Sequence, residues 1–589
     1  MLAAQAAIRY NVTVAKRDGA VHVAWVRRQY KDRTYEYPLL RRSYREGGKV
    51  KNQTLANLSH LPLDLVEIIR RRLAGEKFLG SEDWEVRRSL PHGHVVAVSG
   101  VMRQLGIAEL LDRQPCRQRD LVLALICARV LMPKSKLATS RSWGESTLSA
   151  VFGVEDASVD EIYAALDWLR ERQPKIEERL AHRHLQEGAL ALYDLSSSYV
   201  EGRHCPLAQL GYSRDGKRGT LQIEYGLITD AEGRPIAVEV VPGNTGDPAT
   251  VATQVEKLKD RFGLQEVVLV GDRGMLTQAR IDTLKERGGI GWISALRSPA
   301  IRALVEAGVI QMSLFDERSL VEISHPDYPG ERLVVCRNPR LAEERARKRQ
   351  DLLQATEAKL QPIVEAVAAG RLHGAAKIGL RVGKVIGTYK MGKHFAVEIT
   401  DDSLGVERQP AEIDAEAALD GLYVIRTSVT AERLASDQVV RAYKQLSQVE
   451  RAFRTWKGYD IQVRPIHHWS EDRVRAHILL CMLAYYVRWQ LERAWAPLLF
   501  RDEERPVLAD PVAPAERSAP ALRKASTQQL EDGSPVHSFS TLLESLTTIV
   551  RNRVVPRGLP ESAAFEVDTT PTPHQARALA LLGISPRTT

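Results

Sequence analysis

The chain has 589 residues, of which 44% are hydrophobic and 27% are charged. This composition excludes a wholly disordered chain, a collagen-like chain and a small disulfide scaffold, and at about 150 residues per domain it predicts about four domains or sub-domains. The 83 Lys and Arg residues outnumber the 74 Asp and Glu residues, so the net charge of +9 favours a polyanionic partner without identifying it.

The cysteines and the apolar runs bear on the cellular compartment. Five cysteines lie far apart without C-x-x-C spacing, which is typical of reduced thiols in a reducing compartment. The most apolar run, from Ile478 to Val487, is bracketed by Arg and His residues, and it is much shorter than the roughly 20 residues of a membrane span. We therefore expect a soluble, cytoplasmic protein without membrane association, in which this run forms a buried helix.

Residues 1–60 carry nearly the whole charge excess. They hold twelve Lys or Arg and four Asp or Glu, and 12 − 4 gives +8. Strand-like alternation around 17–19 and 46–48 predicts two β-hairpins, over 12–28 and 41–54. This basic, β-rich N-terminal region could lie along a phosphate backbone. Its charges could equally be the outward face of an ordinary antiparallel sheet.

The next region, 61–188, is predicted to be helical. From residue 189 the pattern becomes strand, strand, strand, helix, strand, helix, strand, which is the order of elements in the ribonuclease-H-like fold. We therefore expect an α/β protein whose residues 189–297 form the first part of a ribonuclease-H-like core. The expected strands are 189–193, 221–229, 235–241, 267–270 and 290–296, and the expected helices are 247–262 and 277–287.

The rest of the chain divides into three predicted segments. Residues 298–430 are predicted to be a β-rich insertion that contains a charged helix, 341–369, and strand periodicity over 377–400. Residues 431–497 complete the core with two helices, 436–456 and 471–495. Residues 498–589 are predicted to be a linker and C-terminal tail, because 501–535 are rich in Pro, Ala and charge.

Three carboxylates stand out by position. Asp194 and Asp272 each end an apolar strand, and ligands bind at the carboxyl edge of an open sheet. Glu450 lies on the helix after the insertion, on one face with Tyr443 and Lys457, because residues seven apart fall about 20° short of two turns. Converging carboxylates repel one another, and oxygen-liganded Mg²⁺ would relieve that repulsion. Two such ions would stabilise the attacking and leaving oxygens of a phosphoryl transfer.

Plainer interpretations of the same residues stay open. Aspartates at strand ends are often only loop caps, and the helix face that also includes Arg454 could be a solvated surface with charge pairs. The loop 212–219, with Arg214, Lys217 and Arg218, could contact phosphates beside Asp194 or form a charged turn. Arg273 could contact a phosphate or hold the local turn.

Several linked motifs together resemble a known family. They are Tyr193-Asp194, 211–219, 243–247, 272–275, 421–427 and 449–454. In them the chain resembles the DDE transposases of bacterial insertion sequences, most closely the sixteen-thirty-four group of the insertion-sequence-four superfamily, over roughly residues 40–495. The superfamily signature Tyr-x2-Arg-x3-Glu-x6-Lys falls on Tyr443, Glu450 and Lys457. Leu446 occupies its arginine position, so Arg451 or Arg454 could supply that charge instead.

The resemblance implies cleavage of insertion-sequence ends and strand transfer into target DNA. Asp194, Asp272 and Glu450 would be catalytic and would bind two Mg²⁺ ions, for which Mn²⁺ could substitute. Base-specific contacts to the terminal inverted repeats would come from residues 1–160, and a homodimer would synapse two ends in a bacterial, nucleoid-associated complex. Further DNA contacts would come from Arg214, Lys217, Arg218, Arg273, Tyr443, Arg454 and Lys457.

Two other functions compete with this one. A domesticated DNA-binding protein without catalysis would be expected to lack one of the carboxylates, whereas all three are present. A ribonuclease-H-like nuclease without strand transfer would leave the extended basic N-terminal region and the insertion unexplained. Both alternatives predict DNA binding, but only the nuclease and the transposase predict cleavage.

Overall fold

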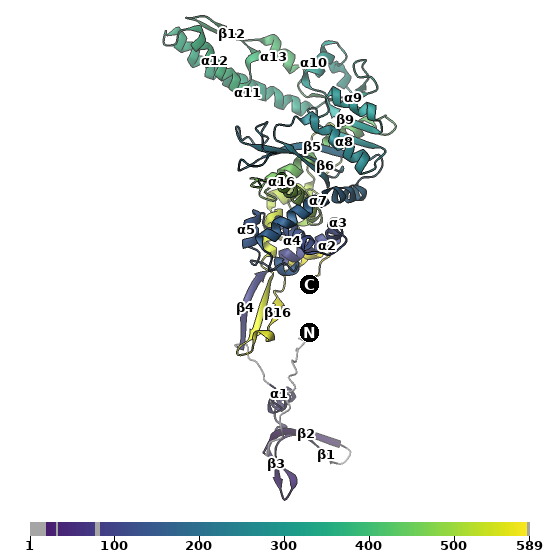
Figure 1. Ribbon diagram of the computed structural model, residues 1–589, viewed down its shortest axis with the longest axis vertical. Helices are drawn as coiled ribbons and strands as arrows, with labels where there is room; N and C mark the ends of the chain where they lie inside the picture. Colours follow the sequence, from purple (N-terminus) through teal and green to yellow (C-terminus); the bar gives the residue numbers. More distant parts are fainter. Residues whose placement is uncertain (1–18, 31–32, 77–82, 586–589) are drawn as a thin grey trace. The chain divides into compact units, whose positions relative to one another are not determined.

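The computed structural model describes residues 19–76 and 83–585 except 31–32, and it divides into two compact units (Figure 1). The first unit contains Met1–Ser89 and Arg551–Asp568, and the second contains Leu90–Val550 and Thr569–Thr589. No helix in the described part of the chain has the length and apolar character needed to cross a lipid bilayer. The five cysteines are unpaired, as their spacing predicts.

The first unit begins with an antiparallel sheet of β1 (Val21–Tyr30), β2 (Arg33–Glu46) and β3 (Lys49–Asn57). Gly47 and Gly48 adopt positive φ between β2 and β3, so the hairpin predicted over 41–54 is confirmed. The other predicted hairpin, 12–28, begins outside the described residues. One helix, α1 (Leu63–Leu73), packs against β1.

A second three-stranded sheet has the order β16-β15-β4. Its strands are β4 (Trp84–Pro91), β15 (Val550–Pro556) and β16 (Phe565–Asp568), and the rings of Trp84 and Phe565 meet edge to face at 5.4 Å. The prediction that 61–188 is helical is wrong at β4, where apolar and charged residues alternate with a period of two. The other secondary-structure elements described in that region are helices.

An eight-stranded mixed sheet organises the second unit, in the order β10-β11-β14-β9-β8-β5-β6-β7. β5 pairs antiparallel with β6 and parallel with β8, and β8 pairs parallel with β9. The strands and helices predicted between 189 and 296 are confirmed within a few residues, except that β5 runs on past Asp194. The strands are β5 (Leu190–Tyr199), β6 (Gln222–Thr229), β7 (Pro235–Pro242), β8 (Val267–Gly271), β9 (Ile290–Ala295), β10 (Leu320–Ile323), β11 (Arg332–Arg337) and β14 (Leu422–Thr427).

Helices pack against this sheet and against one another. The helix α16 contacts α4, α7 and β7, and it is buried on nearly every side, which confirms the buried helix predicted at Ile478 to Val487. Ser470 caps α16 by accepting a hydrogen bond of 3.3 Å from the Arg473 amide. The helices of this group are α2 (Gly93–Gln104), α3 (Ile107–Leu111), α4 (Arg117–Leu131), α5 (Lys136–Arg141), α6 (Leu148–Val151), α7 (Val159–His184), α8 (Val251–Glu256), α9 (Gln278–Arg287) and α16 (Glu471–Ala494).

The region 298–430 is more helical than predicted. The strand periodicity expected over 377–400 is wrong for its first half, because Ile378 and Val382 are buried while Leu380 is 78% exposed, which is helical spacing. The strands β10, β11 and β14 belong to the main sheet. The helices are α10 (Ser298–Glu306), α11 (Pro339–Ala368), α12 (Ala375–Tyr389) and α13 (Pro410–Ala417), with a small hairpin of β12 (Phe395–Ile399) and β13 (Leu404–Arg408).

The segment predicted to be a linker and tail, 498–589, contains ordered elements. They include α17 (Ala519–Thr527), α18 (Phe539–Leu546) and α19 (Pro573–Leu581). Apolar side chains of α18 and α19, such as Leu542 and Leu579, are buried in the same hydrophobic core as α16. The Trp495 indole also donates a hydrogen bond of 2.9 Å to the Ala578 carbonyl. Part of the C-terminal segment therefore completes the core.

Two glycines allow three backbone segments to approach closely at the start of β6. Gln209 and Gln222 exchange backbone hydrogen bonds of 3.0 Å, and the Gly243 amide donates to the Leu207 carbonyl at 3.0 Å. A Cβ at Gly243 would lie 2.0 Å from the Gln222 carbonyl oxygen, and one at Gly211 would lie 1.9 Å from the Gly243 carbonyl oxygen. These approaches fix the base of the loop 211–219.

Gly243→Ala should therefore lower the free energy of unfolding, because its methyl group would overlap backbone atoms. We expect a loss of about 1–3 kcal/mol or more, measured by chemical denaturation. Gly246→Ala is the matched control, since a Cβ there meets nothing within 4 Å and its φ is −76°. Equal stabilities for the two variants would contradict the close approach.

Candidate active site

The aspartates predicted to be catalytic start from neighbouring parallel strands. Tyr193 on β5 is level with Gly271 on β8, so the next residues, Asp194 and Asp272, stand at the same height in the sheet. Because β5 continues to Tyr199, Asp194 lies within its strand, whereas Asp272 follows the end of β8. The register of two parallel strands thus brings together two carboxylates that are far apart in the sequence.

The third carboxylate comes from α15 (Leu446–Lys457), which packs against β5. Phe453 and Trp456 of this helix are buried, and both rings contact Tyr225 of β6, at 5.7 Å and 5.8 Å between centroids. This aromatic contact anchors one face of α15 on the sheet. Glu450 lies on the exposed side of the helix, close enough for its charge to act on Asp194.

Electrostatics link the three carboxylates directly. Burial raises the pKa of Asp194 to about 7, and the charges of Asp272 and Glu450 contribute to that rise. The Leu195 amide, which donates to Asp194 Oδ1 at 2.8 Å, opposes the rise, as does the charge of Arg214. None of the three carboxylates forms a salt bridge within the described part of the chain. Asp194 is therefore a carboxyl group whose ionisation is disfavoured until a cation arrives.

Local backbone geometry orients Asp272. Its Oδ1 atom accepts hydrogen bonds from the amides of Gly274 (2.8 Å) and Met275 (2.9 Å). The Ser294 hydroxyl donates to the Asp272 carbonyl at 3.1 Å. The turn after β8 therefore fixes one carboxylate oxygen of Asp272.

Tyr443 lies beside the carboxylates on α14 (Ser436–Lys444). The prediction of one continuous helix over 436–456 is wrong, because α14 ends before Gln445 and α15 begins after it. Burial and the negative charge of Asp272 raise the pKa of Tyr443 to about 12, against an opposing effect of Arg273. Leu446, at the signature's arginine position, is buried, so that position contributes to the core.

Arg214 is placed near the aspartates but is already paired. Its Nη2 donates to Asp247 Oδ1 at 2.6 Å, and its Nη1 lies 3.3 Å from Glu224 Oε1. Glu224 is buried on β6, and this burial raises its pKa to about 7. Arg214 therefore ties the motif 211–219 to the motif 243–247.

Lys457 is likewise engaged within the protein. Its Nζ lies 3.0 Å from Asp215 Oδ1, and Arg464 also forms a salt bridge with this carboxylate. Asp215 in turn accepts a hydrogen bond of 3.3 Å from the Tyr199 amide. Lys457 therefore joins α15 to the loop 211–219, and its contact with DNA stays a prediction.

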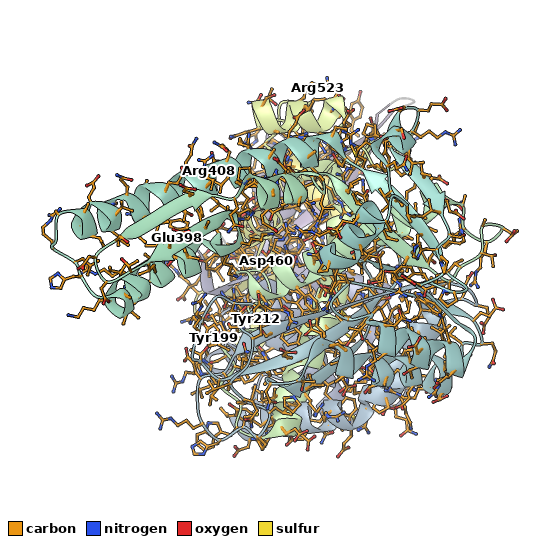
Figure 2. All side chains as sticks on the ribbon, turned by 90° about the horizontal axis from the view of Figure 1, so that it is seen from above. Tyr199, Tyr212, Glu398, Arg408, Asp460 and Arg523 are labelled. Atoms are coloured by element: carbon orange, nitrogen blue, oxygen red, sulfur yellow. The ribbon has the colours of Figure 1, made fainter. Side chains whose placement is uncertain are left out.

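The other predicted DNA contacts are exposed. Lys217, Arg218, Arg273 and Arg454 all reach solvent. Figure 2 shows Tyr199 and Tyr212 on the same side of the molecule, and Lys217 Nζ lies 3.5 Å from the centroid of the Tyr199 ring. These exposed cations form no salt bridge within the described residues, whereas Arg214 and Lys457 are paired with acidic residues.

Two acidic residues of this site were not predicted, Glu224 and Asp215. An acid among the mostly apolar residues of strand 222–229 was a usable signal for Glu224. Asp215 stands between Arg214 and Lys217, and its role became visible only when Lys457 and Arg464, more than 200 positions later, were placed beside it.

The donor chemistry fits a hard divalent cation. Three carboxylates with mutually interacting charges supply the oxygen ligands that Mg²⁺ prefers. Among the described residues, however, no group of three or more His, Cys, Asp or Glu side chains is arranged so that it could hold a metal ion as it stands. The three side chains would have to move towards one another around an ion.

Acidic residues from two neighbouring strands of a mixed sheet and from a packed helix, with exposed cations nearby, form a site suited to a divalent cation and a polyanion. The transposase DDE domain matches residues 194–487, and the N-terminal domain of IS1634 family transposases matches residues 24–83. The chain therefore belongs to the DDE transposases, in the IS1634 group. The predicted family is confirmed, and with it the enzyme class, a DNA-cleaving transposase.

One solved structure shows a weaker similarity. A piggyBac transposase synaptic complex with hairpin DNA aligns over 77% of this chain and 76% of that chain, with 11% identity and a TM-score of 0.32. A similarity at that level supports no inference about the fold. No curated protein sequence matches the chain.

The raised pKa of Asp194 predicts a pH-dependent stability. Because the folded pKa is near 7 and the ordinary value is 3.8, the folded state binds more protons than the unfolded state between these pH values. The Asp194 contribution to the free energy of unfolding therefore falls as pH rises from about 4 to about 7. Asp194→Asn should remove this contribution and be more stable than wild type at pH 8, by at least about 1 kcal/mol.

Chemical denaturation of both proteins in a chelator, from pH 4.5 to pH 8, measures this difference. Glu224 titrates in the same range, but it is present in both proteins and cancels in the comparison. Parallel pH profiles for wild type and Asp194→Asn would show that the carboxyl is not perturbed.

Proposed function

We propose that this transposase cleaves the ends of its insertion sequence and transfers the freed strands into target DNA, with Asp194, Asp272 and Glu450 holding two Mg²⁺ ions. The observation that carries the proposal is the electrostatic coupling of three carboxylates from β5, β8 and α15, which have no salt-bridge partner within the described residues. Mn²⁺ would substitute for Mg²⁺, because it too prefers oxygen ligands.

The topology supports a ribonuclease-H-like core. The strands β7-β6-β5-β8-β9 are consecutive in the sheet, the first three antiparallel and the last three parallel. This is the arrangement expected from the order of elements in residues 189–297. After the interruption by residues 298–430, α15 packs against the central strand β5, and this helix carries Glu450.

The protein's own residues would orient the reacting groups. Bound divalent cations would supply charge stabilisation at the phosphate oxygens and would make water more acidic. The turn amides hold Asp272, and Asp194 would lose its proton when cations bind. Tyr443, with a pKa of about 12, keeps its hydroxyl proton near neutral pH and can donate a hydrogen bond to a phosphate oxygen.

The bond changes follow from phosphodiester chemistry. In the first step, a water oxygen bonds to phosphorus while the bond from phosphorus to the 3′ oxygen breaks. The attacking water gives up a proton to solvent, and the departing 3′ oxygen takes up a proton from solvent to become a hydroxyl group. In the second step, that 3′-hydroxyl attacks a phosphodiester of the target, and a target 3′-hydroxyl is released. The exposed cations Lys217, Arg218, Arg273 and Arg454 would contact the phosphate backbone during both steps.

The partners in this proposal are duplex DNA and a second copy of the chain. The basic sheet β1–β3 and the helical region up to residue 160 would recognise the terminal inverted repeats. Synapsis of two ends requires two active sites, so a homodimer is the proposed complex. Its location would be the bacterial cytoplasm, on the nucleoid.

The test is a nicking assay on a duplex that bears the element's own end. Wild type should nick the duplex with Mg²⁺ or Mn²⁺ and not with a chelator. Asp194→Asn, Asp272→Asn and Glu450→Gln should each lower the rate at least about 10³-fold, because a lost ligand removes several kcal/mol of transition-state stabilisation. Strand transfer is scored by joining to a supercoiled plasmid.

Glu256→Gln is the matched control, because Glu256 is an exposed carboxylate on α8 without an assigned role. It should retain wild-type activity. Wild-type activity in any of the three carboxylate variants would disprove the assignment of that residue. Binding without nicking by wild type would favour a domesticated DNA-binding protein, and nicking without joining would favour a nuclease.

A further inference from the structure

The insertion arm, defined here as residues 339–417, carries a stretch of one charge sign. It consists of α11, α12, the β12–β13 hairpin and α13. Residues 366–397 hold six Lys or Arg and no Asp or Glu, in a chain whose 83 basic and 74 acidic residues are otherwise nearly balanced. The whole of α12 lies in this stretch.

The helix α12 gathers its cations on the side that faces away from the protein. Ile378 and Val382 are buried in an apolar cluster with residues of α11 and the hairpin. Lys377, Arg381 and Lys384 are exposed, and spacings of four and three residues place them on one face of the helix. We call this surface the α12 basic face.

The protein does not neutralise this face. Lys377, Arg381 and Lys384 form no salt bridge within the described residues, whereas Lys393, beyond the end of α12, pairs with Glu416. Two of the acids near α12 have other partners. Asp401 Oδ1 accepts from the Ala375 amide at 2.9 Å, and Glu357 of α11 is bound by Arg408. Glu398 and Glu407 lie on the hairpin strands.

The exposed side of α12 also carries two glycines, Gly383 and Gly387, beside the exposed Leu380. A Cβ at Gly383 or Gly387 would meet nothing within 4 Å, so packing inside the protein does not require glycine at either position. Glycine destabilises a helix relative to alanine. The absence of side chains at Gly383 and Gly387 would allow a partner to approach the helix backbone closely.

We propose that the α12 basic face binds the backbone of double-stranded DNA, through its phosphates and without reading bases. The positive charges of this face complement the negative charges of DNA phosphates, and the three cations lie on one helix face that a phosphate backbone can reach. Figure 2 shows the arm, with Glu398 and Arg408, projecting on the side where Tyr199 and Tyr212 lie. A duplex bound at the carboxylates would then extend along the arm. This inference rests on the proposed function, because it assumes that duplex DNA is the substrate.

The experiment measures how affinity for duplex DNA depends on salt. Fluorescence anisotropy of two labelled duplexes, one with the element's end and one of unrelated sequence, is followed in a chelator so that no cleavage occurs. For wild type and for Lys377→Ala/Arg381→Ala/Lys384→Ala, the logarithm of the binding constant is plotted against the logarithm of the salt concentration. The slope is negative. Because the triple variant would lose three phosphate contacts, the magnitude of its slope should be smaller than that of wild type by about 2–3 for both duplexes.

A matched control removes three cations from the same arm. Arg347→Ala/Lys348→Ala/Lys359→Ala changes α11, where basic and acidic residues are interspersed, and it should leave the slope near that of wild type. Lys377→Arg/Lys384→Arg keeps the charge and should also retain the wild-type slope, which separates loss of contact from loss of folding.

Three results would overturn the proposal: an unchanged slope in the α12 variant, an equal fall in the α11 control, or a fall confined to the element-end duplex. Nicking in Mg²⁺ is scored separately. Wild type that binds but does not nick would refute the proposed function and leave the α12 result standing. An unchanged slope with normal nicking would refute only the α12 basic face.

Discussion

The placement of Asp194, in a partly buried position beside two further carboxylates, is the constraint on which the site depends. The register of β5 and β8 sets Asp194 level with Asp272, and aromatic packing of α15 against the sheet brings Glu450 towards them. The protein provides no salt bridge for any of these groups within its described residues, and Asp194 is partly buried. The packing of the sheet and α15 therefore holds Asp194 where its ionisation is disfavoured, and a divalent cation would relieve that effect.

The cations around this site form two groups, one paired with acidic residues of the protein and one exposed to solvent. Arg214 and Lys457 are paired with Asp247, Glu224 and Asp215, and they hold the loop 211–219 against the ends of the sheet and against α15. The exposed cations Lys217 and Arg218 of that loop, and the three cations of the α12 basic face, form no salt bridge within the described residues. The first group fixes the geometry of the protein, and the second is available to a polyanionic substrate.

Local patterns explain why much of the core could be predicted. The strands around Asp194 and Asp272 are short apolar runs with polar ends, and their pattern does not depend on distant residues. The helix α12 was mistaken for a strand because Ile378, Leu380 and Val382 alternate with polar or small residues. Only the exposure of Leu380 shows that the period is helical. The partner of Lys457 could not be predicted, because Asp215 lies more than 200 positions earlier in the chain.

The central claim is that a divalent cation draws Asp194, Asp272 and Glu450 into one coordination sphere. Crystals of the wild-type protein grown with Mn²⁺ and measured at the manganese absorption edge would test it most directly. We expect anomalous density with carboxylate oxygens of all three residues as ligands, and we expect it to be lost in Asp272→Asn. Saturating Mn²⁺ without density at these side chains, or density that persists unchanged in Asp272→Asn, would contradict it.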